Sequence, residues 1–141
     1  MQTFFQKNNK SDSGLFHEIE QACEGLIYIS ETDSPFIPFA GQLTDTVTAD
    51  VILQQTGIAG EGPVEEREFA EFFDRLTVIK DWYGEPEKAR AKKFVELRML
   101  LEENLRELKV FRIGRIQLDI FAVGINKDGF LMGVTTKAVE T

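Results

Sequence analysis

The stretch VFRIGRIQLDIFAVGINKDGFLMGVTTKAV, at residues 110–139, decides the fold of this 141-residue chain. Its middle alternates between two sets of residues: Ile116, Leu118, Ile120 and Ala122 against Arg115, Gln117, Asp119 and Phe121. A period of two predicts strands, and Asn126–Gly129 has the composition of a hairpin turn. Short connections between consecutive strands favour antiparallel neighbours. The stretch therefore predicts a meander of three strands, at 110–113, 115–123 and 130–139.

Apolar residues before this stretch recur mainly at helical spacing. The longest predicted helix begins near Pro86, a residue suited to a first helical turn, and its apolar stripe is Phe94, Leu97, Leu101, Leu105 and Leu108. Shorter helices are predicted from a cap at Ser11 or Ser13 to Gly25, from Thr48 to Gly57, and over 65–76. A short strand is predicted at 26–30. A loop should follow it, because Pro35 and Pro38 forbid a central strand.

These elements predict an α+β fold with one domain at 11–141 and a flexible N-terminal extension at 1–10. A mainly antiparallel sheet covered by helices is expected, with α/β/α layering. Hydrophobic residues make up 43% of the chain, yet no apolar run is long enough to span a membrane. The first 14 residues, MQTFFQKNNKSDSG, do not have the pattern of a secretory signal. The single cysteine cannot form an internal disulfide, so we predict a cytoplasmic protein.

Charge is unevenly distributed along the chain, whose formal net charge is −8. Residues 11–87 carry 17 acidic and three basic side chains, whereas residues 88–141 carry seven acidic and 11 basic ones. An acidic region repels phosphate backbones, which disfavours direct binding of nucleic acid. It would also accelerate the encounter with a basic protein. Ordinary solubility is the other explanation for the same charge.

The residues that could carry catalysis form no recognisable set. His17 is the only histidine, and it lacks the nucleophile and orienting carboxylate of a catalytic triad. With Cys23 as the only cysteine, a zinc ligand set is also missing. The glycines at 57, 60 and 62 lack the GK[ST] ending of a phosphate loop. We therefore expect no enzyme and no cofactor; a hydrolase using Glu31 and Asp33 is a minor alternative.

Several stretches together resemble one family, the intracellular nuclease A inhibitors, from about residue 15 to 141. They are LIYISETDSPF at 26–36, VILQQTG at 51–57, DWYGEPEKARAKKF at 81–94, VFRIGRIQLDIFAVG at 110–124 and GVTTKAVET at 133–141. The combination of the DWY, QQTG and TTKAVET segments is specific, whereas each alone is weak. Loops around 37–48 and 58–80 differ.

The resemblance implies a 1:1 complex with a sugar-non-specific DNA/RNA endonuclease of the ββα-metal type. By this likeness the C-terminal Thr141 would approach the magnesium of the nuclease, through a water molecule, and the chain would bind no metal of its own. Glu31 would pair with a cation of the nuclease, and Asp81 and Trp82 would add a carboxylate contact and an aromatic anchor.

Three of these residues also have an ordinary interpretation. Trp82 could belong to the core, Glu31 could be a solvated acid, and Asp81 could supply negative charge near a helix N-terminus. The whole chain could instead be a general interaction or immunity-type domain with a partner that is not a nuclease. The three-dimensional structure decides whether the four residues converge on one surface.

Overall fold

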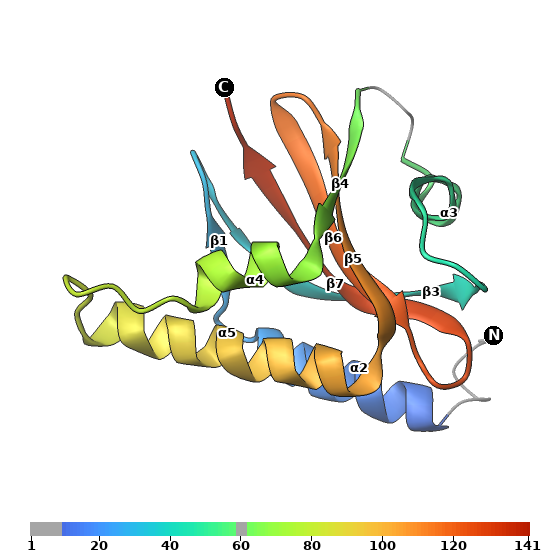
Figure 1. Ribbon diagram of the computed structural model, residues 1–141, viewed down its shortest axis with the longest axis horizontal. Helices are drawn as coiled ribbons and strands as arrows, with labels where there is room; N and C mark the ends of the chain where they lie inside the picture. The colour runs from blue at the N-terminus through green and yellow to red at the C-terminus, as the bar shows by residue number, and fades with distance from the viewer. Residues whose placement is uncertain (1–9, 59–61) are drawn as a thin grey trace.

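The 110–139 stretch forms the centre of the sheet in the computed structural model, which describes residues 10–58 and 62–141 (Figure 1). Strands β5 (Arg106–Gly114), β6 (Gln117–Ile125) and β7 (Phe130–Val139) pair antiparallel in sequence order, which confirms the predicted meander. Strand β5 begins four residues earlier than predicted, because the preceding helix ends at Asn104. Leu108, which the sequence placed in the helical stripe, therefore lies in β5. The predicted N-terminal extension lies almost wholly outside the described residues.

Two further strands complete a five-stranded sheet of order β3-β7-β6-β5-β4, and the sequence predicted neither. Strand β3 (Ile37–Leu43) replaces part of the predicted loop, and Pro38 is compatible with it because β3 lies at an edge. Strand β4 (Val64–Glu68) replaces the first turn of the predicted helix 65–76. Its acidic residues pair with basic ones across β5, as in Glu65 opposite Arg112. Such cross-strand pairs stabilise a strand that local propensity does not favour.

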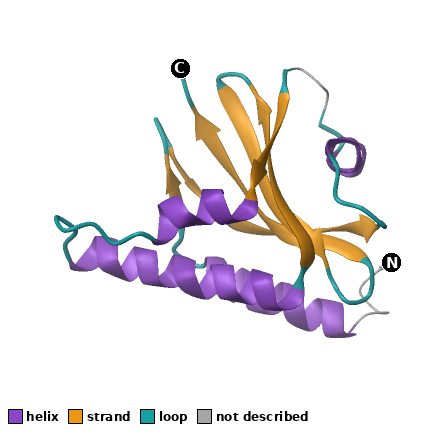
Figure 2. Ribbon diagram, in the orientation of Figure 1, coloured by secondary structure: helices purple, strands orange, loops and turns teal. Residues whose placement is uncertain are grey.

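The helices lie on both faces of the sheet, which confirms the α+β class and the predicted α/β/α layering (Figure 2). Helices α2 (Lys10–Cys23), α4 (Phe69–Thr77) and α5 (Glu85–Asn104) cover one face, and α3 (Ala49–Thr56) covers part of the other. Helix α2 begins at Lys10, so the predicted cap at Ser11 or Ser13 is wrong. Within the described part of the chain, no helix is long and apolar enough to cross a membrane.

The ends of α3 and α5 follow the expected capping chemistry. The Thr48 hydroxyl accepts a hydrogen bond of 3.2 Å from the Val51 N–H, and Gly57 ends α3 with a φ of 70°. At the start of α5, the Gly84 N–H donates to the Glu87 carboxylate over 3.0 Å. Both boundaries can therefore be derived from local sequence.

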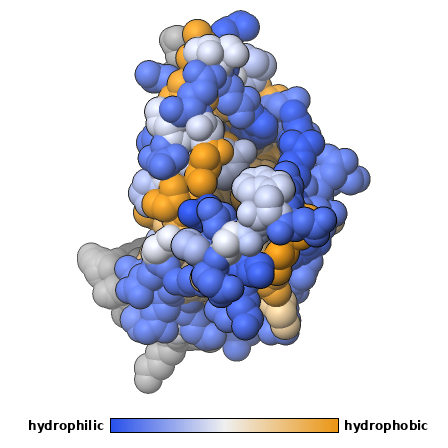
Figure 3. Space-filling model, turned by 90° about the vertical axis from the view of Figure 1, so that its left-hand side faces the viewer, coloured by the Kyte–Doolittle hydropathy of each residue, from blue (hydrophilic) through white to orange (hydrophobic). Residues whose placement is uncertain are grey.

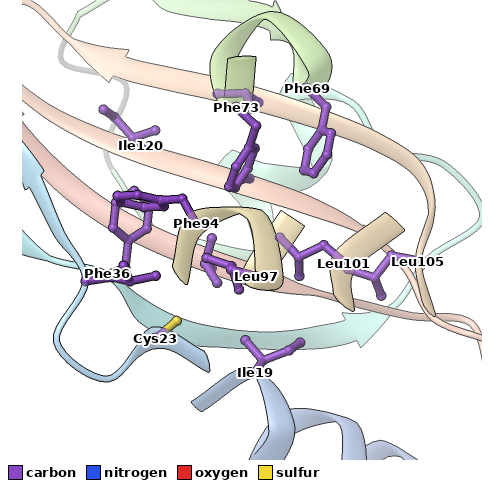
Figure 4. Close-up of a cluster of buried hydrophobic side chains, with 14 of the residues drawn as sticks. Ile19, Cys23, Phe36, Phe69, Phe73, Phe94, Leu97, Leu101, Leu105 and Ile120 are labelled. Carbon is purple, nitrogen blue, oxygen red and sulfur yellow. The ribbon is translucent and has the colours of Figure 1, made fainter. Parts of the chain in front are cut away.

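A hydrophobic core lies on each face of the sheet. On the face covered by three helices, α5 inserts Phe94, Leu97 and Leu101 between the sheet and the other two helices (Figure 4). On the opposite face, Ile52 of α3 packs with Phe111 and Phe121 of the sheet. Phe121 belongs to the set of β6 residues that begins with the polar Gln117 and Asp119, so along β6 this face changes from polar to apolar.

A small hairpin stands beside the free end of β7. Its strands are β1 (Ile27–Ile29) and β2 (Asp33–Pro35), and the Thr136 hydroxyl of β7 donates a 2.9 Å hydrogen bond to the Pro35 carbonyl. The tip of the hairpin, residues 30–32, points to the same end of the molecule as the C-terminus (Figure 1). The hairpin thereby brings Glu31 to the last residues of the chain.

Candidate functional site

The residues that follow β7 are held from two sides. On one side, the Glu31 N–H donates to the Val139 carbonyl over 3.2 Å, and the Val139 N–H donates to the Ser30 hydroxyl over 3.1 Å. On the other, the Glu140 N–H donates to the Ile116 carbonyl over 2.9 Å. Backbone pairing therefore continues past the end of β7 to Glu140.

Glu31 and Thr141 contact each other directly, although 110 positions separate them. The Thr141 N–H donates to Glu31 Oε2 over 2.6 Å, and its hydroxyl lies 3.0 Å and 2.9 Å from the two carboxylate oxygens. The hydrogen bond from the Thr141 backbone, and then the one from its side chain, hold the pKa of Glu31 below its ordinary value. We call this pair the Glu31–Thr141 clamp. The structure therefore brings two of the four predicted binding residues into contact.

Arg112 of β5 contacts the residue next to the clamp. Its guanidinium forms an ion pair of 2.5 Å with Glu140, the neighbour of Thr141, and its side chain is only 14% exposed. Sequence reasoning missed Arg112 and Ser30. A charged residue between Phe111 and Ile113 was the available signal for Arg112, whereas nothing marked Ser30 as a partner of Val139.

Trp82 lies in the loop between α4 and α5 and is 73% exposed, so the alternative that placed it in the core is wrong. Its ring makes an edge contact with Tyr83, with centroids 4.8 Å apart, and Lys80 Nζ lies 5.9 Å from its centroid. Asp81 lies three residues before Gly84, the N-cap of α5, rather than in the first turn of that helix. This loop therefore presents an aromatic ring and a carboxylate to solvent.

The Asp81–Trp82 loop and the clamp lie apart in the structure (Figure 1). Among residues 10–58 and 62–141, no hydrogen bond, ion pair or ring contact joins the Asp81–Trp82 loop to Glu31 or Thr141. The loop projects at the left of Figure 1, and the view from that side shows apolar patches among hydrophilic atoms (Figure 3). A single partner surface would have to span both regions.

The other chemistry-bearing residues lie elsewhere. His17 is exposed on α2, 3.6 Å from Glu20, whereas Cys23 is buried, and burial raises its pKa to about 12. Asp33 begins β2, opposite Ile29. Gly57 caps α3, and Gly60 lies outside the described residues. The described part of the chain has no group of three His, Cys, Asp or Glu residues that could hold a metal ion.

The fold and its exposed end define an α+β domain whose candidate binding residues stand at the surface, on a hairpin tip, a chain end and a loop. A family model described as nuclease A inhibitor-like protein matches residues 13–141, and the chain belongs to this family. Membership supports a role in nuclease inhibition in general, with a nuclease as the partner. Comparison with curated proteins gives no match.

Proposed function

We propose that the chain inhibits a sugar-non-specific, metal-dependent DNA/RNA endonuclease of the ββα-metal type by filling its active-site cleft in a 1:1 complex. The observation that carries this proposal is the Glu31–Thr141 clamp. A loose chain end would lose conformational entropy on binding, whereas a held end has already lost it on folding. The clamp therefore supports Thr141 as the group that enters the cleft.

In this proposal Thr141 approaches the magnesium of the nuclease with its oxygens. These are the hydroxyl and, in a chain that ends at Thr141, the terminal carboxylate. Magnesium prefers oxygen ligands and releases its waters reluctantly, so contact through a water molecule is the reasonable geometry. An oxygen of Thr141 would then stand where a substrate phosphate oxygen belongs, and substrate would be excluded.

Glu31 has a second task in the complex, namely pairing with a cation of the nuclease. A carboxylate offers about four lone-pair positions, and Thr141 supplies only two donors to it. Because Glu31 is exposed, the remaining positions can accept from a guanidinium or an ammonium group. One side chain can thus hold Thr141 and contact the partner.

Asp81 and Trp82 supply the proposed contact at the rim of the complex. An exposed tryptophan contributes a large apolar area when a partner covers it, and interfaces often depend on such residues. The acidic charge of residues 11–87 would steer the chain to a basic nucleic-acid cleft. The chain acts here as a protein ligand, without direct binding of nucleic acid.

We place this activity in the cytoplasm. The chain has one cysteine, which the structure buries, and burial raises the pKa of its thiol far above neutral pH. A buried protonated thiol is inert. A domain that needs no disulfide suits a reducing compartment.

The decisive experiment titrates the purified chain against metal-dependent nucleases while degradation of DNA and RNA is followed. We expect activity to fall linearly and to vanish at one inhibitor per nuclease. A variant of the chain with additional residues after Thr141 should inhibit much more weakly at the same molar ratio of inhibitor to nuclease. Full inhibition by this extended protein would refute the cleft-filling mechanism. Degradation by the chain alone, abolished by Glu31→Gln, would instead support the hydrolase that uses Glu31 and Asp33.

A further inference from the structure

A hollow of about 230 Å³ lies between β1, α4 and the sheet, on the face that α4 and α5 cover. Helix α4 supplies Glu71, Phe72 and Arg75 to its wall, and β1 supplies Tyr28. The sheet supplies Arg67 from β4 and Arg112 from β5. Three guanidinium groups thus line one hollow in a chain whose formal net charge is −8.

The three arginines differ in how they are paired. Arg67 lies 3.0 Å from Glu65, and Arg112 pairs with Glu140. No ion pair is found for Arg75 in the part of the chain that the structure describes. Glu65 and Glu140 are half-exposed and do not line the hollow. The pair of Arg67 with Glu65 lies at the surface, where ion pairs contribute little. An anion in the hollow could therefore compete with Glu65 for Arg67, and it would meet Arg75 without displacing an ion-pair partner.

Arg112 also keeps an unused donor. Its Nε is buried and has no hydrogen-bond partner among the described residues, since the Glu65 carboxylate lies 3.9 Å away. Buried polar atoms are nearly always hydrogen-bonded in folded proteins. An acceptor atom in the hollow would satisfy this donor.

Most of the charged groups that act on the Tyr28 hydroxyl are cations of the hollow. Burial raises the pKa of Tyr28 above its ordinary value, and the charged groups that act on it after burial are Arg112, Glu140, Arg75 and Arg67. Three of these four groups are cations. The Glu71 carboxylate also lines the hollow, but it is not among the charged groups that act on Tyr28.

We propose that this hollow binds a phosphoryl oxyanion, either inorganic phosphate or the phosphate of a nucleoside monophosphate. Guanidinium groups on α4, β4 and β5 can donate to a tetrahedral oxyanion from different directions, and a planar carboxylate has fewer oxygens to accept from them. The Tyr28 ring, stacked on Phe72 at 5.8 Å and 14°, offers an apolar wall for a larger ligand. Such binding does not depend on the nuclease inhibition proposed above.

The first test titrates inorganic phosphate, a nucleoside 5′-monophosphate and acetate into the full chain at constant ionic strength, and follows backbone amide resonances by NMR. We expect saturable shifts at residues of β1, α4, β4 and β5 with phosphate, and none with acetate. Tighter binding of the nucleotide would indicate that its base or sugar also contacts the hollow, and equal binding would assign the phosphoryl group alone. Equal binding of acetate, shifts in other elements, or no saturation would each overturn the proposal.

The second test compares two variants with the same chemical change. Arg75→Gln removes the unpaired cation of the hollow, and Arg115→Gln removes an exposed arginine outside it. We expect Arg75→Gln to weaken phosphate binding about tenfold or more, because bonds to charged groups are among the stronger hydrogen bonds. Arg115→Gln should leave it unchanged, and both variants should keep the wild-type circular dichroism. If both variants bound phosphate equally weakly, the net charge of the chain would explain the effect, and a defined site would be refuted.

Discussion

Thr141 at the end of β7 and Trp82 in the loop before α5 are both exposed, yet only Thr141 is held by another element. Its N–H and hydroxyl donate to Glu31 on the β1–β2 hairpin, and the backbone of Val139 and Glu140 pairs with Glu31 on one side and with Ile116 on the other. Trp82 contacts Tyr83 and Lys80, which belong to its own loop. One region is therefore set by long-range hydrogen bonds, and the other by local side-chain packing.

This difference indicates how each region would contribute to a protein interface. A held group suits directional contacts, because little order remains to be gained when the partner binds. An exposed ring suits apolar burial, which tolerates small adjustments of position and depends little on salt. Substitutions at the clamp should thus alter the geometry and electrostatics of the contact with the partner. Substitutions at the loop should alter the apolar area that the partner buries.

The largest effect is expected from deleting Thr141. Deletion removes the oxygens proposed to approach the nuclease metal and leaves the Glu31 carboxylate without its donors, so inhibition should weaken about a hundredfold or more. The inhibition constant measured by nuclease titration tests this expectation. Thr141 is exposed and outside both cores, so the free energy of unfolding should change by no more than about 0.5 kcal/mol. Unchanged inhibition would remove Thr141 from the interface.

A smaller effect is expected from Trp82→Ala. Loss of an aromatic anchor at an interface costs about 2 kcal/mol, or about 30-fold in affinity. The matched control is Leu43→Ala, because Leu43 is 65% exposed and lies at the end of β3, away from the loop. Isothermal titration with the nuclease should separate the two variants while both unfold as the wild type does. A Trp82 variant that binds like the control would restrict the interface to the clamp.

The parts of the fold that could be predicted from sequence are those that local chemistry determines. The alternation in β6 and the turn at Asn126–Gly129 predict the meander, and the Thr48 and Gly57 caps predict α3. Strands β3 and β4 could not be predicted, because each depends on a partner that is remote in sequence, β7 for one and β5 for the other. A segment that contains a proline or several glutamates can be recognised as a strand only when its position at the edge of the sheet is known.

The candidate site shows the same limit. Family resemblance nominates Glu31 and Thr141 separately, but only the folded β1–β2 hairpin brings them into contact across 110 positions. The sequence predicts Arg112 only as part of a strand. Its ion pair with Glu140 depends on the order of the strands in the sheet. Trp82 could be assigned to the core or to the surface from sequence alone, because a loop tryptophan suits either. Its exposure settles that question, and its contact with a partner stays a prediction.

A third prediction concerns Glu31→Gln, which keeps the size of the side chain but removes its charge and one of its two acceptor oxygens. We expect inhibition to weaken about tenfold, in line with loss of a charge-assisted hydrogen bond. The heteronuclear NOE of the Thr141 amide should fall as the clamp loosens, which a purely electrostatic role in steering would not produce. Glu18→Gln, on the exposed surface of α2, is the matched control. An unchanged NOE would show that backbone pairing at Glu140 is sufficient to hold Thr141.

The smallest expected effect is the response of the clamp to pH. Hydrogen bonds from Thr141 hold the pKa of Glu31 below its ordinary value, so the folded state favours the ionised carboxylate. A lowered pKa of this kind contributes stability above the unfolded value of about 4.3, and the contribution is lost as pH falls through the folded pKa. Because Glu31 is fully exposed, this change should be detectable at the clamp and barely in global unfolding. An NMR titration should therefore show the Thr141 amide moving with a midpoint below the ordinary pKa of glutamate, and deletion of Thr141 should return Glu31 toward that ordinary value. The same Glu31 midpoint in both proteins would mean that Thr141 does not hold the carboxylate in solution, and the distinction between a held end and a locally packed loop would then disappear.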